Sequence, residues 1–377
     1  MGMTFNMVGG NGGGNVKISG TYTRQPDGLT RSTPTALSQA RMTAAGASVG
    51  NYALCMGGYT SGVVNTVDAY DTSLTRTTPT SLSQARFIAD GASVGNYALC
   101  MGGWNMSSNT SFNTVDAYDT SLTRTTPTAL SQARFSAAGA SVGNYALYMG
   151  GWNASSNMST VDAYNRSLTH STPTALSNTR RAGAGASVGN YALCMGGYTS
   201  GTVNTVDAYD TSLTRTTPTV LSQARSDGAG ASVGNYALCM GGWGMTTVDA
   251  YDTSLTRTTP TSLSQARDMA AGTSVGSYAL CMGGYTYGVA FYDTVDAYDT
   301  SLTRTTPTAL SQARQSGAGA SVGNYALCMG GGASSDPYTS PVATVDAYCV
   351  KESVVLHLSD ASAFSSGGNI TGRVTLS

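Results

Sequence analysis

The chain has 377 residues, a formal net charge of −1 and only 10% charged residues, so it lacks the basic surface that nucleic-acid binding needs. No apolar run approaches the ~18 residues of a membrane-spanning helix, which argues against membrane insertion. The first residues, MGMTFNMVGGNGGGN, lack the basic and apolar regions of a secretory signal, so we expect the protein to be made and folded in a cytoplasm.

One unit is repeated along almost the whole chain. Its closing motif, SQAR in most copies, ends at Arg41, Arg86, Arg134, Arg180, Arg225, Arg267 and Arg314. These arginines are 42 to 48 residues apart. A period in this range indicates a repeat architecture in which each unit packs on its neighbours.

Each unit contains four short runs that read as β-strands. The first two, GASV and YALCM, are joined by Gly-Asn, which favours a two-residue hairpin turn, and Gly-Gly ends the second. The third, VDAY, precedes the turn residues Asp-Thr-Ser. The fourth, LTRTTPTAL, carries a proline in every copy, so we expect it at a sheet edge. Seven such antiparallel sheets can bury their faces only by packing around an axis, so the sequence predicts an all-β, seven-bladed β-propeller.

The repeats begin and end out of phase. The first repeat segment, residues 29–37, matches the fourth run of the unit, and runs one to three do not precede it. The last repeat segment, residues 344–348, matches the third run, and no fourth run follows it. We therefore expect the amino-terminal strand to close the last blade of a propeller formed by residues 29–348. Residues 1–28, rich in glycine, would serve for attachment or form a small β element, and residues 349–377 would form a β tail that could pair with them.

The repeat resembles a known family. The run R-x-x-(A/G)-x-G-A-S-V-G-N-Y-A-L-C-M-G-G, a variable loop and then V-D-A-Y-D is similar to the Kelch repeat, with its Gly-Gly doublet after strand two and its tyrosine on strand three. One departure is that the family usually has a tryptophan on strand four, where this chain has Thr and Arg. The near-identity of the copies also resembles the repetitive Kelch-like proteins of bacteriophages and prophages of gut bacteria.

All of the length variation lies in one loop. Between Gly-Gly and VDAY the copies hold 8, 11, 9, 8, 5, 10 and 13 residues, and subtracting the first six lengths from the six arginine spacings leaves 37 each time. Substitutions cluster there and just after the arginine, whereas the Val-Gly-Asn and Asp-Thr-Ser-Leu turns barely change. Loops after strands two and four leave an up-and-down sheet on the same side. We therefore predict a variable face, and an opposite constant face on which the termini leave.

Candidate ligand-contacting residues come from two positions of the variable face. One follows Gly-Gly and is aromatic in six blades: Tyr59, Trp104, Trp152, Tyr198, Trp243 and Tyr285. The other lies just after the arginine: Met42, Phe87, Phe135, Arg181, Asp227, Asp268 and Gln315. Aromatic rings offer rigid apolar area for stacking on sugars or side chains. The alternative is that these rings lean on the Gly-Gly backbone and fill the space between blades.

The repeated charges have structural interpretations. The VDAY aspartates and SQAR arginines match in number, and we expect salt bridges within or between blades. The strand-four arginines, replaced once by His170, would be solvated edge charges. Asp90 stands where other blades have alanine, and we expect it to face the central channel.

Neither catalysis nor metal binding is expected from the composition. Six cysteines occupy one equivalent position of strand two, too far apart for disulfides, and we expect buried free thiols. The chain has only two histidines, and no paired carboxylates stand out from the repeat pattern. We therefore predict a protein that is not an enzyme and that uses no cofactor or metal.

The variable face and the resemblance together predict a binding protein on a bacteriophage virion surface, as a fibre, receptor-binding or decoration protein made in the host cytoplasm. Its partners would be a host cell-surface glycan or protein, and other virion proteins through the termini, with a homo-oligomer also open. One alternative is a purely architectural virion or filament subunit. The other is an intracellular bacterial Kelch protein-interaction scaffold in the cytoplasm.

Overall fold

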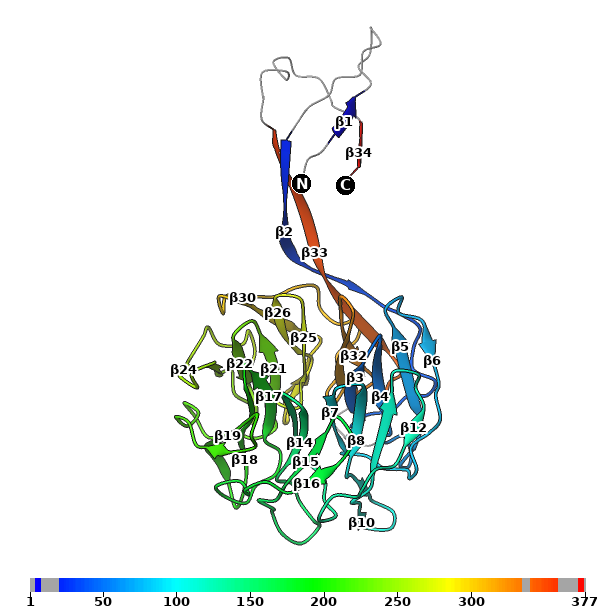
Figure 1. The fold of residues 1–377 in the computed structure, drawn as a ribbon, viewed down its shortest axis with the longest axis vertical. Coiled ribbons are helices and arrows are strands. Elements are labelled where there is room, and N and C mark those ends of the chain that lie inside the picture. Colours follow the sequence, from blue (N-terminus) through cyan, green and yellow to red (C-terminus); the bar gives the residue numbers. More distant parts are fainter. Residues whose placement is uncertain (1–3, 8–19, 334–339, 359–371, 376–377) are drawn as a thin grey trace. The chain divides into compact units, whose positions relative to one another are not determined.

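The computed structural model describes residues 4–7, 20–333, 340–358 and 372–375. The regular secondary structure in these ranges consists of β-strands alone. Seven sheets of four antiparallel strands form a propeller (Figure 1). The predicted fold class and blade number are confirmed.

Each blade follows the order one, two, three, four from the axis outward. The first strands of blades one to seven are β3 (Ala45–Val49), β7 (Asp90–Val94), β13 (Ala138–Val142), β17 (Ala184–Val188), β21 (Ala229–Val233), β25 (Ala271–Val275) and β31 (Ala318–Val322). The second strands are β4 (Tyr52–Met56), β8 (Tyr97–Met101), β14 (Tyr145–Met149), β18 (Tyr191–Tyr198), β22 (Tyr236–Met240), β26 (Tyr278–Met282) and β32 (Tyr325–Met329). The third strands are β5 (Val67–Asp71), β11 (Val115–Asp119), β15 (Val161–Asn165), β19 (Thr202–Asp210), β23 (Val248–Asp252), β29 (Val295–Asp299) and β33 (Val345–Leu358).

The outer strands are much shorter than the sequence suggests. Those of blades one to six are β6 (Arg76–Thr77), β12 (Arg124–Thr125), β16 (His170–Ser171), β20 (Arg215–Thr216), β24 (Arg257–Thr258) and β30 (Arg304–Thr305). The expectation that each would include its proline is wrong. Proline has no backbone N–H to donate, and it restricts the conformations open to the residue before it. The chain therefore leaves the sheet before it reaches the proline.

The last blade is closed by the amino-terminal strand, as predicted. Strand β2 (Gly20–Ser32) lies beside β33 in the order β2-β33-β32-β31. The Arg31 guanidinium is 2.9 Å from the Asp346 carboxylate, and the Thr30 hydroxyl is 3.0 Å from the Cys349 thiol. Side chains from both ends of the repeat array therefore hold the ring shut.

The chain divides into two compact units, Thr30–Cys349 and a second one made of Met1–Leu29 and Val350–Ser377. In the second unit β1 (Thr4–Met7) pairs antiparallel with β34 (Gly372–Thr375). The two ends of the chain thus share a two-stranded ribbon. Most of the glycine-rich segment expected to serve for attachment lies outside the described residues.

The innermost strands touch through a ring of glycines. A Cβ placed on Gly91 would lie 2.1 Å from the carbonyl oxygen of Gly46 in the preceding blade. The same approach, at 2.0 to 2.4 Å, recurs at Gly46, Gly139, Gly185, Gly230, Gly272 and Gly319. Any larger residue would collide with backbone, so the second residue of each AGASV strand must be glycine.

Serines add a second ring of contacts around the axis. The Ser93 hydroxyl donates to the Ser48 carbonyl at 2.6 Å, and the Ser93 amide donates to the Ser141 hydroxyl at 3.3 Å. The ring closes where the Ser48 hydroxyl donates to the Ser321 carbonyl at 2.7 Å. Each inner strand is therefore tied to both neighbours by polar groups that face a narrow axial space.

The apolar core lies between blades. The strand-two cysteine and strand-three tyrosine of blade two, Cys100 and Tyr118, pack on Leu54, Met56 and Val67 of blade one. The Tyr118 hydroxyl also donates to the Thr80 carbonyl at 2.7 Å, which satisfies its polar end. The six strand-two cysteines are free and buried, as predicted.

A buried ion pair joins each repeat to the next. The SQAR arginine lies 2.5 to 2.7 Å from the VDAY aspartate of the following blade, and both side chains are almost fully inaccessible. In one example Arg86 also donates to the Cys100 carbonyl at 3.2 Å, and the Ser83 hydroxyl donates to Asp116 at 3.0 Å. The predicted salt bridges are thus confirmed as contacts between the linker and the next blade.

The strand-four cations are not the solvated edge charges that we expected. They are partly buried and lie 2.8 to 3.6 Å from the same aspartates, as Arg124 does from Asp116. In blade three His170 takes this place beside Asp162. Each aspartate accepts hydrogen bonds from several directions, which compensates its removal from water.

Candidate functional site: the variable face

The two variable positions meet on one face of the propeller. The residue after the arginine pairs through its backbone with the residue after Gly-Gly, as in Phe87 and Trp104, whose amides donate to each other's carbonyls at 3.1 and 2.9 Å. The other pairs are Met42–Tyr59, Phe135–Trp152, Arg181–Tyr198, Asp268–Tyr285 and Gln315–Gly332. In blades two and six the loop continues as a short ribbon, β9 (Trp104–Asn105) with β10 (Thr110–Ser111) and β27 (Tyr285–Thr286) with β28 (Ala290–Phe291).

The constant turns meet on the opposite face. Strand register places Tyr52, after one constant turn, directly beside Asp71, which begins the other. A Cβ on Gly50 would touch Thr120 of the next blade at 2.9 Å, so these turns also pack between blades. At the same edge of blade seven, Cys349 lies opposite Tyr325. The carboxyl end of the propeller unit therefore lies at the constant face.

The candidate residues differ sharply in exposure. Five of those that follow the arginine are buried: Met42, Phe87, Phe135, Asp268 and Gln315. Arg181 and Asp227 are half-buried, as are five of the six aromatics after Gly-Gly. Trp243 differs, with 59% of its surface exposed.

In the first four blades the aromatics pack on one another. Phe87 lies between Tyr59 and Trp104, with ring centroids 5.4 and 5.5 Å away, and Trp104 stacks on Phe135 at 5.1 Å. The Arg181 guanidinium lies 4.5 Å from the Trp152 ring and 5.0 Å from the Tyr198 ring. These rings therefore fill space between neighbouring blades, which is the structural alternative raised above.

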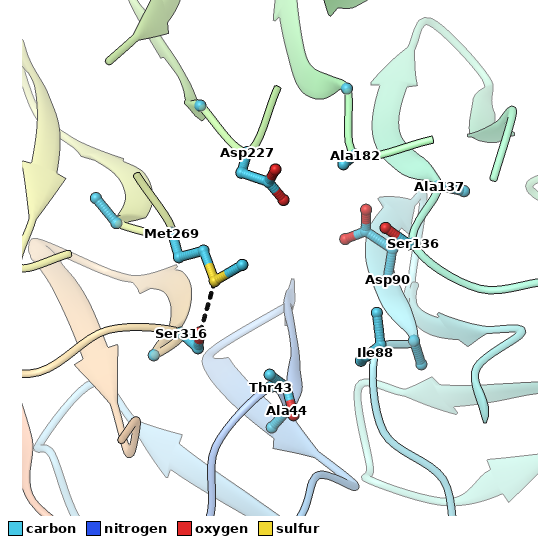
Figure 2. A pocket seen from close by; sticks show the side chains of 15 residues that line it. Thr43, Ala44, Ile88, Asp90, Ser136, Ala137, Ala182, Asp227, Met269 and Ser316 are labelled. Carbon is cyan, nitrogen blue, oxygen red and sulfur yellow. Dashed lines mark hydrogen bonds between the residues drawn. The ribbon is translucent and has the colours of Figure 1, made fainter. Parts of the chain in front are cut away.

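A shallow cavity opens on the axis of the variable face. Seven equivalent residues with φ near +50°, among them Thr43, Ile88 and Asp227, form a closed circle of backbone hydrogen bonds of 2.8 to 3.2 Å. They line a cavity of about 320 Å³ together with Asp90 (Figure 2). Figure 2 shows Asp90 and Asp227 reaching into this space from different blades, and the predicted orientation of Asp90 is confirmed.

Burial changes the acidity of both carboxyls. Desolvation raises the pKa of Asp90 to about 6, although the Gly91 and Gly139 amides each donate to it at 2.9 Å and oppose the shift. The pKa of Asp227 is also raised by burial, against a hydrogen bond from the Ser226 hydroxyl and the charge of Arg181. Burial thus favours the protonated, neutral form of both carboxyls that line the axial cavity.

A larger cleft lies off the axis, between blades five and six. It has a volume of about 480 Å³ and is lined by Trp243, Gly244, Asp268, Tyr285, Thr286 and Tyr287. The exposed side chains of Tyr287 and Val289, at 87% and 74%, come from the same loop of blade six. This cleft brings Trp243, Tyr285 and Asp268 together from the predicted set.

The cleft forms because the two loops differ in length. Blade five has the shortest loop, five residues, and its Trp243 has φ of +48° and forms none of the paired bridges of the other blades. Trp243 therefore lacks the backbone bridge that holds the equivalent residue in other blades, and its side chain is exposed. The ten-residue loop of blade six lies beside it. Sequence reasoning did not single out Tyr287, although it is the second aromatic of its loop.

Asp268 forms the polar part of this cleft. Only 7% of the residue is exposed, and its Oδ1 has no hydrogen-bond partner among the described residues. Desolvation, with the nearby charge of Asp227, raises the pKa of Asp268 to about 7. The cleft thus combines aromatic walls with an unsatisfied carboxylate oxygen.

Two kinds of feature are absent from the described residues. No cluster of His, Cys, Asp and Glu there could hold a metal ion. Among the same residues no helix is long and apolar enough to span a membrane.

Comparison with known proteins gives a structural likeness. No family model matches the chain, and no curated protein matches it. The solved structure of YjhT is similar, with a TM-score of 0.56, 11% sequence identity, and coverage of 85% of this chain and 99% of the other. At this identity the likeness supports the β-propeller fold alone.

Proposed function

We propose that this protein is a non-enzymatic binding protein that contacts a partner through its variable face. The observation that carries the proposal is the distribution of exposed apolar side chains. Of the five large hydrophobic residues most exposed in the described part of the chain, Trp243, Met269, Tyr287 and Val289 lie on the variable face. Exposed apolar groups gathered on one face are typical of a recognition surface.

The partner in this proposal is a glycan or protein on a host cell surface, and the binding protein belongs to a bacteriophage virion. The resemblance of the near-identical repeats to repetitive Kelch-like phage proteins supports this assignment. Each propeller offers a small exposed apolar area, so its individual contacts would be weak. Many copies on one particle would compensate for this, because multivalent attachment multiplies avidity.

The binding proposal is tested with a double variant, Trp243→Ala with Tyr287→Ala, on a glycan array and on host cells. Both side chains are exposed, so their truncation leaves the packed blades intact. We expect binding to fall at least tenfold relative to the wild type. Val220→Ala, an exposed apolar residue on the strand-four linker, is the matched control and should bind normally. Undiminished binding of the double variant would contradict the proposal.

The virion assignment has its own test. Antibodies against the propeller, imaged by electron microscopy on purified phage particles, should label a defined part of the particle. Absence of the protein from particles would overturn the assignment and favour an intracellular scaffold. Labelled particles that adsorb normally when they carry the double variant would favour an architectural subunit.

A further inference from the structure

The cleft between blades five and six differs from the junctions between blades one to four on the variable face. In blades one to three the aromatic after Gly-Gly packs on a ring or guanidinium of the next blade, and Tyr198 of blade four packs on Arg181 of its own blade. Trp243 has Tyr198 on one side, with ring centroids 6.4 Å apart, and the open cleft on the other. The cleft volume of about 480 Å³ is ample for a small organic group.

Within the described part of the chain, the carboxylate in this cleft has no compensating cation. Its Oδ1 is buried and unpaired, and the charged group that acts on it is another carboxylate, Asp227. The repeated arginines nearby are engaged elsewhere: Arg225 pairs with Asp249 at 2.5 Å and Arg267 with Asp296 at 2.6 Å. Arg181 acts on Asp227 and contacts the rings of Trp152 and Tyr198. The backbone amide of Asp268 itself donates to this carboxylate, but Oδ1 has no partner among the described residues, and a donor supplied from outside would offset the cost of burying it.

We propose, building on the binding function above, that this cleft takes an organic ammonium group, held between the rings of Trp243, Tyr285 and Tyr287 and the carboxylate of Asp268. Aromatic faces carry negative electrostatic potential and attract cations, and a desolvated site strengthens that attraction. The carboxylate supplies the counter-charge for the ammonium group, and the ammonium group supplies the cation that the described residues do not place beside it. A neutral sugar would stack on the same rings but would leave the negative charge of the cleft uncompensated.

Two sources of such a group are distinguishable by chemistry. A quaternary ammonium, as in a choline head group, binds by its diffuse charge and fills an aromatic cleft without hydrogen bonds. A primary ammonium, as on a lysine side chain, would also donate a hydrogen bond to Asp268 Oδ1. Each has a neutral counterpart of nearly the same shape, which separates charge from stacking.

The experiment titrates the full-length protein at pH 8, where Asp268 is ionised, with four probes followed by tryptophan fluorescence and ligand-observed NMR. The pairs are choline against 3,3-dimethylbutan-1-ol, and Nα-acetyl-lysine amide against its Nε-acetylated form. We expect at least one charged probe to bind tenfold or more tightly than its neutral counterpart. Asp268→Asn and Trp243→Ala should each weaken that binding at least tenfold, whereas Val220→Ala should not.

Equal binding of charged and neutral probes, or undiminished binding to Asp268→Asn, would overturn the ammonium site. Tyr287→Ala provides a second variant, because its exposed side chain makes loss of folding an implausible cause of any effect. The outcome is separable from that of the proposed function. If host binding needs Trp243 and Tyr287 but ammonium compounds neither bind nor compete, this inference fails and the binding function stands.

Discussion

At the scale of single residues, the buried VDAY aspartate of each blade is the group on which the ion pairs converge. Asp116 is inaccessible and lies 2.7 Å from Arg86 and 3.2 Å from Arg124. We expect Asp116→Asn to lower the free energy of unfolding by about 3–5 kcal/mol, because it leaves a buried guanidinium without its counter-charge. Chemical denaturation measures the effect.

The chain itself supplies the matched control for this change. Asp119, three residues on, caps a constant turn by accepting from the Ser121 and Thr123 amides at 2.8 and 2.9 Å. In blade three Asn165 occupies the equivalent position and accepts the same two bonds at 2.9 Å. Asp119→Asn should therefore stay within ~0.5 kcal/mol of the wild type. Equal effects of the two variants would show that the buried pair adds nothing specific.

A second residue-scale prediction concerns pH. The pKa of Asp268 is about 7 in the folded chain and its ordinary value is 3.8, so between about pH 4 and 7 the folded state holds a proton that the unfolded state has lost. Asp227 is the charged group that opposes ionisation of Asp268, and the Tyr285 phenol beside it is neutral in this range. This carboxyl therefore makes stability fall as pH rises through that window.

Asp268→Asn removes this titrating carboxyl. The difference in unfolding free energy, variant minus wild type, should therefore increase by on the order of 2 kcal/mol as the pH rises from 4 to 8. Asp90 titrates in an overlapping range in both proteins and cancels in the difference. Thermal unfolding followed by circular dichroism at several pH values measures it. A difference that stays constant with pH would mean that Asp268 ionises normally in the folded protein.

At the scale of elements, the inner strands are limited by backbone contact. A Cβ on Gly91 would lie 2.1 Å from the Gly46 oxygen and 2.8 Å from its carbon, and neither atom can move without shifting a strand. We expect Gly91→Ala to cost about 3 kcal/mol or more, or to prevent folding. Gly62→Ala, in a variable loop where nothing lies within 4 Å of the new atom, should be nearly neutral. Expression yield and melting temperature compare the two.

The strands and their order could be predicted from the repeat, because turn residues bracket each run and recur seven times. The length of strand four could not. Its proline indicated an edge, but the sequence does not show that pairing ends as early as Thr77. The variable face followed from strand parity, whereas the burial of Asp268 and Phe87 depends on loop pairing that no local pattern encodes. The exposure of Trp243 follows from the short loop of five residues that it begins. The loop length can be read from the sequence, although we did not connect it with exposure.

At the scale of the whole molecule, ring closure depends on one strand supplied from the far end of the repeat array. The Thr30 Oγ1 lies 3.0 Å from the Cys349 Sγ, while the other six cysteines are buried. We expect Thr30→Cys to form a disulfide with Cys349 on oxidation and to raise stability by up to roughly 5 kcal/mol, since the loop it closes is very long. Mobility on a non-reducing gel and the melting temperature report both effects.

Thr30→Cys combined with Cys349→Ser is the control, and it should show neither the cross-link nor the gain. A cross-link that forms without raising the melting temperature would indicate that unfolding begins away from this junction. Loss of cooperativity after cross-linking would instead contradict closure by β2.

Nearly the same groups meet at every junction around the ring: a glycine against a carbonyl, a linker arginine against the next aspartate, and a serine against a serine, with Thr273 against Ser321 between blades six and seven. The framework contacts between copies are therefore nearly interchangeable, although loop side chains such as Trp104 and Phe135 also pack across particular junctions. Recombination between copies would reorder, duplicate or replace the loops on one side while the glycine and arginine–aspartate contacts of the framework stayed as they were. Such a gene could diversify what its product touches at the pace of DNA exchange, and a lineage of these proteins should differ in loop order far more than in framework.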